Sequence, residues 1–379
     1  MQSGHHRQQA TTHNEAFALG VDGMDSLTQA ALGAAVSVAV LRQRAPVWQS
    51  ALWGAAMGTA PDLDVLIDHG NPVLNMTQHR AHSHALFYQV ALAVGLGGAA
   101  YWAVAKRAPA AVRGEKTRAI ALWSLAMMLA WTTHALLDAM TVYGTRLWLP
   151  FSDASVGVGS VFIIDPLYTL PLLLGLAGVW RWAGPMGTAF LWLGLGLSSL
   201  YLVWSFAAQQ WVLRQVKPQV PNAHVKLLAT PSPFNTVLWR VVAVDAAGYY
   251  EGWVSLFDKQ VKPRWVAYAC PASVYEQART SHEVAELAKL SNGFFCLKGD
   301  GTTWRMTDLR MGQEPGYVFA FDISHPAAGD TARATIVQRP FVPPPLPLSL
   351  TWLHQRLTSQ TPLSLPAWQA QQSADNHQR

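Results

Sequence analysis

Histidine and aspartate recur in the first half of the chain with spacings that suit a metal ion. The segment HRAHSH (79–84) holds three imidazoles, and this density is typical of either a metal site or a solvated basic loop. His134 and Asp138 lie four positions apart, so they share one face of a helix and can bind zinc or a similar divalent ion together. His79 and His84 can share a site if a helix begins between them.

Carboxylates stand near these histidines in the predicted fold. Asp62 and Asp64 follow Pro61, and in a turn both can face one pocket, or one can bind the metal while the other orients a histidine. Asp165 can join them, or it can cap a helix that begins with Pro166. These residues together predict a site for zinc or a similar divalent metal.

Catalytic roles follow from the same residues. A divalent metal supplies Lewis acidity for hydrolysis, and Asp62 or Asp64 can act as general base if it is not a ligand. Arg80 can clamp a phosphate with help from Arg146, or it can simply anchor the chain at the membrane interface. His82 is expected to face solvent. The expected catalytic residues are Asp62, Asp64 and Arg80.

The composition indicates a membrane protein. Of the 379 residues 51% are hydrophobic and 13% are charged, whereas soluble domains carry about 25% charged residues. The net charge is +5, but no basic block resembles a nucleic-acid stripe, so we expect no nucleic-acid partner. The expected partners are the lipid bilayer and an amphiphilic or lipid-linked substrate.

The apolar character is uneven and divides the chain. We predict a mainly α fold, in which a polytopic transmembrane helical bundle precedes a small α+β soluble domain of mostly antiparallel strands. The expected units are a disordered extension (1–23), a membrane-embedded metal-site domain (24–213), a β-rich domain (214–339) and an extended, proline-rich tail (340–379).

Four runs have about the 20 residues that a membrane-spanning helix needs. These are 85–105, 119–140, 161–180 and 186–207, and two shorter runs, 27–41 and 47–61, can span or re-enter. Basic residues fall in alternate loops, which predicts that loop 106–118 is cytoplasmic. The protein is then a multi-pass protein of a bacterial inner membrane, with the metal site and the C-terminal domain on the periplasmic side.

The second half reads as a small β domain. Strand-like runs include WRVVAVD, YYEGWVSLF, RWVAYAC, GFFCLKG and YVFAFDI, with a helix expected over 273–291. Cys270 and Cys296 can form a disulfide in an oxidising compartment or remain two buried thiols. This domain can cover the metal pocket or bind a partner.

Five segments together resemble a known family. They are MDSLTQAALGAAV, GTAPDLDVL, HRAHSHAL, HALLDAMTVYGTRLWLPFS and FIIDPLYTLPLL, and they are similar in order and spacing to the LexA-regulated, membrane-bound metal-dependent hydrolases of bacterial inner membranes. That family is distantly similar to zinc-dependent phospholipase C and P1-type nucleases. The resemblance implies a zinc site with six ligands: Asp62, Asp64, His79, His84, His134 and Asp138. The chain departs from it at Thr28-Gln29, where many members have Thr-His, and at Ala85, where a hydroxyl residue is replaced.

These features together predict a function. We expect a membrane-bound metal-dependent hydrolase with a periplasm-facing His/Asp site that acts on a phospholipid or lipid-linked phosphoester. An ion- or proton-coupled transporter is an alternative, although transport favours charges near mid-span rather than at one end. A non-catalytic membrane scaffold would explain the β domain but not the polar cluster.

Overall fold

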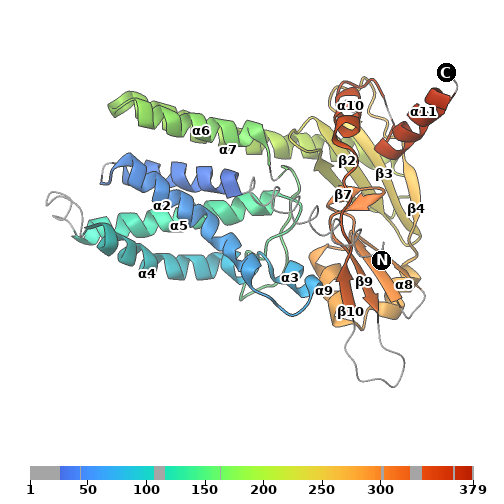
Figure 1. Ribbon diagram of the computed structural model, residues 1–379, viewed down its shortest axis with the longest axis horizontal. Coiled ribbons are helices and arrows are strands. Elements are labelled where there is room, and N and C mark those ends of the chain that lie inside the picture. Colours follow the sequence, from blue (N-terminus) through green and yellow to red (C-terminus); the bar gives the residue numbers. More distant parts are fainter. Residues whose placement is uncertain are drawn as a thin grey trace, which may run out of the picture.

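The computed structural model describes residues 26–42, 44–105, 116–162, 164–299, 303–324, 335–361 and 363–377. An elongated bundle of helices forms one part, and a β-rich domain sits on one end of it (Figure 1). The expected disordered extension and most of the predicted cytoplasmic loop, 106–115, lie outside the described residues.

The helices of the bundle run along its long axis. They are Ser26–Leu41, α2 (Val47–Thr59), α4 (Leu86–Ala105), α5 (Lys116–Met140), α6 (Pro166–Arg181) and α7 (Gly184–Val216). Short elements connect α2 to α4 at the end that faces the β domain, namely η1 (Ala60–Leu66), α3 (Pro72–Gln78) and η2 (His82–His84).

Only some of the described helices of the bundle are long enough to cross a membrane. Within the described ranges, Arg118–Met140 and Gly184–Gln219 have the length and apolar composition of spanning helices, whereas Ser26–Leu41 and Leu86–Ala99 are shorter. The run predicted at 161–180 forms the 16-residue α6, because Asp165 and Pro166 delay its start. The predicted polytopic bundle is therefore not confirmed.

The outer surface of the bundle is apolar. On α7 the side chains of Leu193, Leu200 and Val203 are mostly exposed, and α4 and α6 expose similar residues. Apolar patches of this extent mark contact with a membrane or a protein partner. Small residues line the inside instead: a Cβ on Gly33 would lie 2.2 Å from the Gly54 carbonyl oxygen, so these two helices touch through their backbones.

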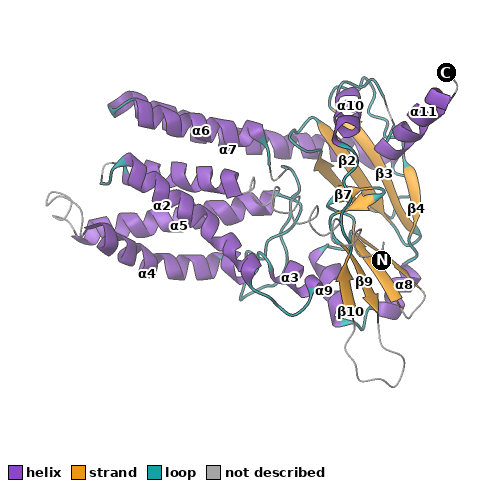
Figure 2. Ribbon diagram, viewed as in Figure 1, coloured by secondary structure: helices purple, strands orange, loops and turns teal. Residues whose placement is uncertain are grey.

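Two antiparallel sheets build the β domain (Figure 2). The first has the order β1-β2-β3-β4, from β1 (Lys226–Pro231), β2 (Leu238–Val244), β3 (Gly248–Ser255) and β4 (Val266–Ala269). The second has the order β10-β9-β6-β5, from β5 (Phe295–Gly299), β6 (Thr303–Asp308), β9 (Ala320–Ser324) and β10 (Thr335–Gln338). A small hairpin joins β7 (Gly312–Gln313) to β8 (Gly316–Tyr317).

The helices of the C-terminal half differ from those that the sequence predicts. The single helix expected over 273–291 is two, α8 (Ala272–Ala278) and α9 (His282–Leu290), which pack with Leu297, Met306 and Phe321 of the second sheet. The tail is not extended throughout, since it forms α10 (Leu346–Leu357) and α11 (Leu365–His377). Trp352 and Trp368 bury both helices against the first sheet, which is why the tail folds.

Covalent and ionic links hold the parts together. Cys270 and Cys296 form a disulfide between the end of β4 and β5, and so join the two sheets. The buried guanidinium of Arg310 pairs with Asp308 and donates hydrogen bonds to the carbonyl oxygens of Tyr143 (2.7 Å) and Leu290 (2.9 Å). Arg310 thereby fixes the β domain to the loop that follows α5.

Candidate metal centre

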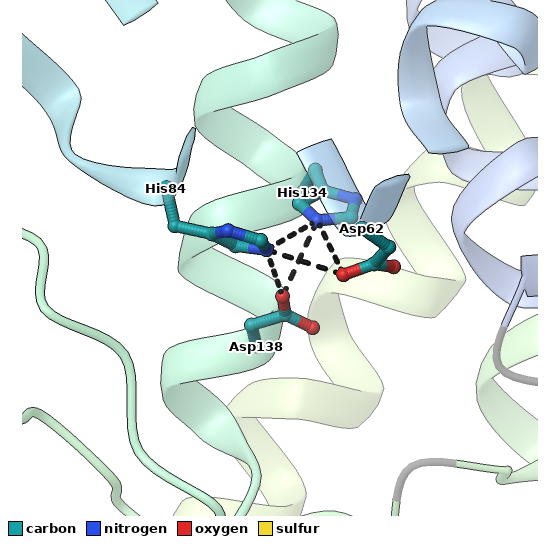
Figure 3. Close-up of side chains that lie close together, drawn as sticks. All are labelled: Asp62, His84, His134 and Asp138. Carbon is teal, nitrogen blue, oxygen red and sulfur yellow. Dashed lines mark hydrogen bonds and ion pairs between the residues drawn. The ribbon is translucent and has the colours of Figure 1, made fainter. Parts of the chain in front are cut away.

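Four side chains from three separate elements meet at the end of the bundle near the β domain. Asp62 comes from η1, His84 from η2, and His134 and Asp138 from the last turns of α5 (Figure 3). One ligand atom from each lies within 4.8 Å of the other three, and all but Asp62 are fully buried. This group could hold a metal ion.

The backbone packing explains why these residues meet. A Cβ on Gly58, at the end of α2, would lie 2.5 Å from the carbonyl oxygen of Gln29, so only glycine lets the first helix approach so closely. The carbonyl oxygen of Gly58 in turn accepts a hydrogen bond from His134 Nδ1 at 2.6 Å. Asp62 follows Gly58 by four residues and is thereby carried to the same point.

Hydrogen bonds fix the tautomer of both histidines. His134 must carry its proton on Nδ1, because the partner of that atom is a carbonyl oxygen. Ser83 Oγ donates to Asp64 Oδ2, so it accepts from His84 Nδ1 at 2.8 Å. When both rings are neutral, each Nε2 atom carries a lone pair and no proton. The two Nε2 atoms face each other at 2.9 Å. Two acceptors at this separation need a proton or a cation between them.

Five of the six distances between the four ligand atoms, from 2.9 to 3.5 Å, are near the edge lengths of a tetrahedral metal site, and the sixth, between Asp62 and Asp138, is within 4.8 Å. Asp138 Oδ2 lies 3.0 Å from His84 Nε2 and 3.3 Å from His134 Nε2, and the corresponding distances from Asp62 Oδ1 are 3.2 and 3.5 Å. A tetrahedron with zinc–ligand bonds of about 2.0–2.1 Å has edges of about 3.3–3.4 Å. Both carboxylate oxygens are buried and receive no hydrogen bond from any described residue. The residues therefore fit a divalent metal.

The second oxygen of Asp138 is held by other groups. Gln29 Nε2 donates to Asp138 Oδ1 at 2.8 Å, and Arg80 Nη2 lies 3.3 Å from the same oxygen. Arg80 is buried, donates to Thr141 and lies over the ring of Tyr143. In this position Arg80 compensates the charge of Asp138, and its expected contact with a substrate phosphate stays a prediction.

Asp64 and His79 do not join the group of four. They form a neighbouring pair, with His79 Nδ1 2.6 Å from Asp64 Oδ1. Asp64 Oδ2 also accepts from the backbone N–H of Arg80, which has a left-handed φ of 61°, and from Ser83. Asp64 therefore orients His84 through Ser83, as the sequence analysis allowed for one of the two aspartates.

The remaining polar residues have structural partners. Asp165 caps α6, since its carboxylate accepts from Leu167 N–H at 2.9 Å and from the Tyr201 hydroxyl at 2.7 Å. Arg146 pairs with Glu286 of α9 at 3.1 Å. His82 is exposed, as expected.

Electrostatics near η1 favour ionised aspartates. Burial acts to raise the pKa of Asp62, but the imidazoles of His134 and His84 lower that pKa below its ordinary value. Burial likewise acts to raise the pKa of Asp64, and His79 and Ser83 lower it. Both carboxyl groups are therefore anions at neutral pH, the form that binds a cation.

Two contributors were missed from the sequence. From the sequence, Gln29 was noted only as a departure from the Thr-His of the similar family, whereas its amide donates to Asp138. No role was assigned to Ser83 from the sequence, and its hydroxyl connects Asp64 to His84. The position of each residue in the sequence could have indicated its role. Gln29 is an amide within a run of small apolar residues, and Ser83 is a hydroxyl residue directly before a ligand histidine.

Comparison with known proteins gives one match. The fold and the cluster together define a helical, apolar protein with a candidate metal site. Residues 24–212, almost half of the chain, match the family described as YdjM inner membrane protein. That description agrees with the inner-membrane part of the resemblance and does not mention a metal or hydrolysis. No curated protein and no solved structure matches significantly.

We predict that His134→Ala removes the bound metal while the protein still inserts. The change deletes one of four ligand atoms and leaves Asp138, one turn away, without its imidazole neighbour. Metal content of the purified protein, measured by elemental analysis, should fall from about one ion per chain toward none. His82→Ala, an exposed histidine nearby, should keep the wild-type content. Equal metal in wild type and His134→Ala would exclude a metal at this position.

We predict that Gln29→Leu weakens metal binding without abolishing it. The substitution keeps the volume but removes the donor to Asp138 Oδ1, so the carboxylate loses one of the groups that orient it. Loss of an orienting partner of a ligand costs about 10–100-fold in metal affinity. Competition with a zinc chelator measures the affinity, and Gln215→Leu, an exposed glutamine of α7, is the matched control. An unchanged affinity in Gln29→Leu would show that Gln29 does not position Asp138.

Proposed function

We propose that the protein is a membrane-bound, metal-dependent hydrolase of a phospholipid or lipid-linked phosphoester. The observation that carries this proposal is the close group of two imidazole nitrogens and two carboxylate oxygens, of which one residue, Asp62, is partly exposed. When bound, a divalent metal supplies Lewis acidity that polarises a phosphoester and activates water. Zinc suits this donor set.

The side chains have distinct roles in this proposal. His84, His134 and Asp138 are buried and rigid, so they hold the ion. Asp62, whose side chain is 21% exposed, is the member that a substrate oxygen can displace and that can then accept a proton. Gln29 and Asp64 are positioning residues, because they act through Asp138 and His84.

The surroundings of Asp62 support an amphiphilic substrate. Four apolar side chains of η1 and the residue after it are 56–78% exposed, namely Leu63, Val65, Leu66 and Ile67. Phe151 and Phe87 add an exposed aromatic pair with ring centroids 5.3 Å apart. Such side chains insert favourably into the lipid interface. Asp62 therefore lies where a lipid headgroup would meet the protein.

We further propose an inner-membrane location with the metal centre and β domain in the periplasm. Three observations support it: the family match, the apolar outer surface of α7, and the disulfide in the domain that sits on the metal end of the bundle. Disulfides persist in oxidising compartments such as the periplasm.

The activity test uses purified, zinc-loaded protein with phospholipid vesicles and a chromogenic phosphodiester. We expect metal-dependent release of product that a chelator abolishes and added zinc restores. Asp62→Asn should lower kcat by about 100-fold or more, the scale of a lost general acid–base group, while His82→Ala stays near wild type. Absence of turnover on every phosphoester, with metal bound, would refute the proposed reaction.

A structural metal is the second candidate. Four protein ligands without an open position are typical of structural zinc, which stabilises a fold without chemistry. In that case chelation would lower the melting temperature strongly, yet the zinc-loaded protein would hydrolyse nothing. The exposed edge at Asp62 favours the hydrolase.

Topology gives an independent prediction. Reporter fusions at Gly114 and Ala223 should report opposite sides of the membrane, Gly114 cytoplasmic and Ala223 periplasmic. The reason is that Gly114 lies in a basic loop and Ala223 precedes the disulfide-bearing domain. If an alkaline phosphatase fusion at Ala223 is inactive, the periplasmic location is wrong.

A further inference from the structure

A large cavity lies between the two sheets of the β domain. Its volume is about 980 Å³, at the upper end of the range of about 300–1,000 Å³ typical of small-molecule sites. One wall carries Thr230, Arg240 and Trp253, which stand opposite one another in register across β1, β2 and β3. The other wall carries alternate residues of β5 and β6, namely Cys296, Lys298, Arg305 and Thr307.

Elements from both halves of the chain close this cavity. The loop after α5 contributes Thr141, Tyr143, Val161 and Phe162. The extended segment 339–345 and α10 line it on another side. The cavity therefore sits at a domain interface, a common place for a ligand site. It is separate from the metal group, whose four ligands do not line it.

The second sheet gives the cavity a cationic wall. Lys298, Arg305 and Arg339 line it, and both arginines pair with a single carboxylate, Asp322, at 2.8 Å. The two guanidinium side chains are about half exposed, so they remain accessible to a ligand. Three cations beside one carboxylate leave an excess of positive charge at this wall.

The deeper arginines of the cavity are already paired with carboxylates. Arg240 is buried against Glu251 at 2.8 Å, and Arg310 against Asp308 at 2.6 Å. Glu314 also lines the cavity, and its carboxylate accepts a hydrogen bond from the neutral Tyr249 hydroxyl without losing its negative charge. The excess charge therefore belongs to the wall of Lys298, Arg305 and Arg339 rather than to the whole cavity.

The first sheet and the tail give an apolar wall instead. Trp253 meets the ring of Trp352 edge to face, with centroids 4.9 Å apart, and Leu353 and Leu365 line the cavity beside them. In Figure 1, α10 and α11 lie over the first sheet, at the opposite end of the domain from β9 and β10. The cavity is thus cationic at one end and apolar at the other.

The cavity is also close to the proposed membrane surface. Pro231, Ser232 and Pro233 line it, and the same loop continues to Thr236, which accepts a hydrogen bond from the Trp204 indole of α7 at 3.1 Å. Phe234, between them, is about half exposed. A molecule that leaves the bilayer along α7 would meet this loop first.

We propose that this cavity binds an anionic amphiphile with a single long acyl chain. Its acidic head would lie at Lys298, Arg305 and Arg339, and its chain would lie along Trp253, Trp352 and Leu353. This site is distinct from the metal centre and does not depend on hydrolysis, although its approach route relies on the proposed membrane span of α7.

The test is photo-crosslinking of the full-length protein in phosphatidylcholine nanodiscs. The probe is a palmitic acid that carries a diazirine near the end of its chain, and its methyl ester is the neutral counterpart. Peptide mass spectrometry should locate the acid on peptides that contain Trp253, Trp352 or Leu353. The ester should label these peptides about tenfold less, because it lacks the charge-assisted contacts.

Two variants separate the head from the chain. Arg305→Ala combined with Arg339→Ala should reduce labelling by the acid about tenfold, to the level of the ester. Ser349→Trp, on the accessible side of α10, should fill the cavity and abolish labelling while all charges remain. Arg279→Ala, which changes an exposed arginine directly after α8 and outside the cavity, is the matched control and should label as wild type. If the double variant unfolds, the loss of labelling in Ser349→Trp tests the proposal instead.

Three results would overturn the proposal. Equal labelling by acid and ester would show that the cationic wall selects nothing. Labels confined to the bundle helices would show that the probe stays in the bilayer. Displacement of the acid by millimolar inorganic phosphate would identify a site for a free anion rather than for an amphiphile.

Discussion

Two imidazole lone pairs and two carboxylate oxygens face one another in a space from which water is almost excluded. The Nδ1 atoms of His134 and His84 donate hydrogen bonds to Gly58 and Ser83. The facing Nε2 atoms of the neutral rings therefore carry no proton. A buried anion without a compensating charge costs several kcal/mol. Arg80 balances one of the two carboxylates, which leaves one negative charge. A divalent cation balances that charge and contacts all four atoms, whereas a single proton shared by the two rings leaves both carboxylate oxygens without a donor. The rest of the structure at this end of the bundle is consistent with that single requirement.

The groups that surround the four ligand atoms orient them toward a common centre. Backbone contacts at Gly33, Gly54 and Gly58 bring two helices together and place η1 against α5. Gln29 and Arg80 occupy one oxygen of Asp138, so the other is left to face the histidines. No one of these contacts binds a metal, yet without them the four ligand atoms would not share a centre.

The β domain also takes part in holding the site. Val73 and Met76 of α3, just before His79, are buried in the core that α9 and the second sheet form. The Tyr143 hydroxyl donates to the Met76 carbonyl oxygen at 2.7 Å, and Arg310 holds the Tyr143 carbonyl oxygen. The segment that carries His79 and His84 is therefore clamped between the bundle and the domain. This explains how the long connection between α2 and α4, which contains only short helical elements, is ordered.

The sequence predicted much of this arrangement, because the strongest signals were local. The i, i+4 spacing of His134 and Asp138 depends on helix periodicity, and the apolar runs of α5 and α7 were recognised by length and composition. The strands β2 and β3 were recognised by their β-branched and aromatic residues. Asp64 and His79 could not be separated from the four ligand residues, since that distinction depends on a three-dimensional contact with Ser83. The tail was misread because its prolines suggested extended chain, whereas Trp352 and Trp368 fold it onto the first sheet. The length of α6 depended on Asp165, whose role as a cap was one of two readings.

The most direct test of the central claim is X-ray absorption spectroscopy at the zinc edge of the purified, zinc-loaded protein. The account predicts a first shell of two nitrogen and two oxygen atoms at about 2.0–2.1 Å, with the outer-shell scattering that is characteristic of two imidazole rings. A shell of six oxygens without imidazole scattering, or protein that retains no zinc after dialysis, would contradict it.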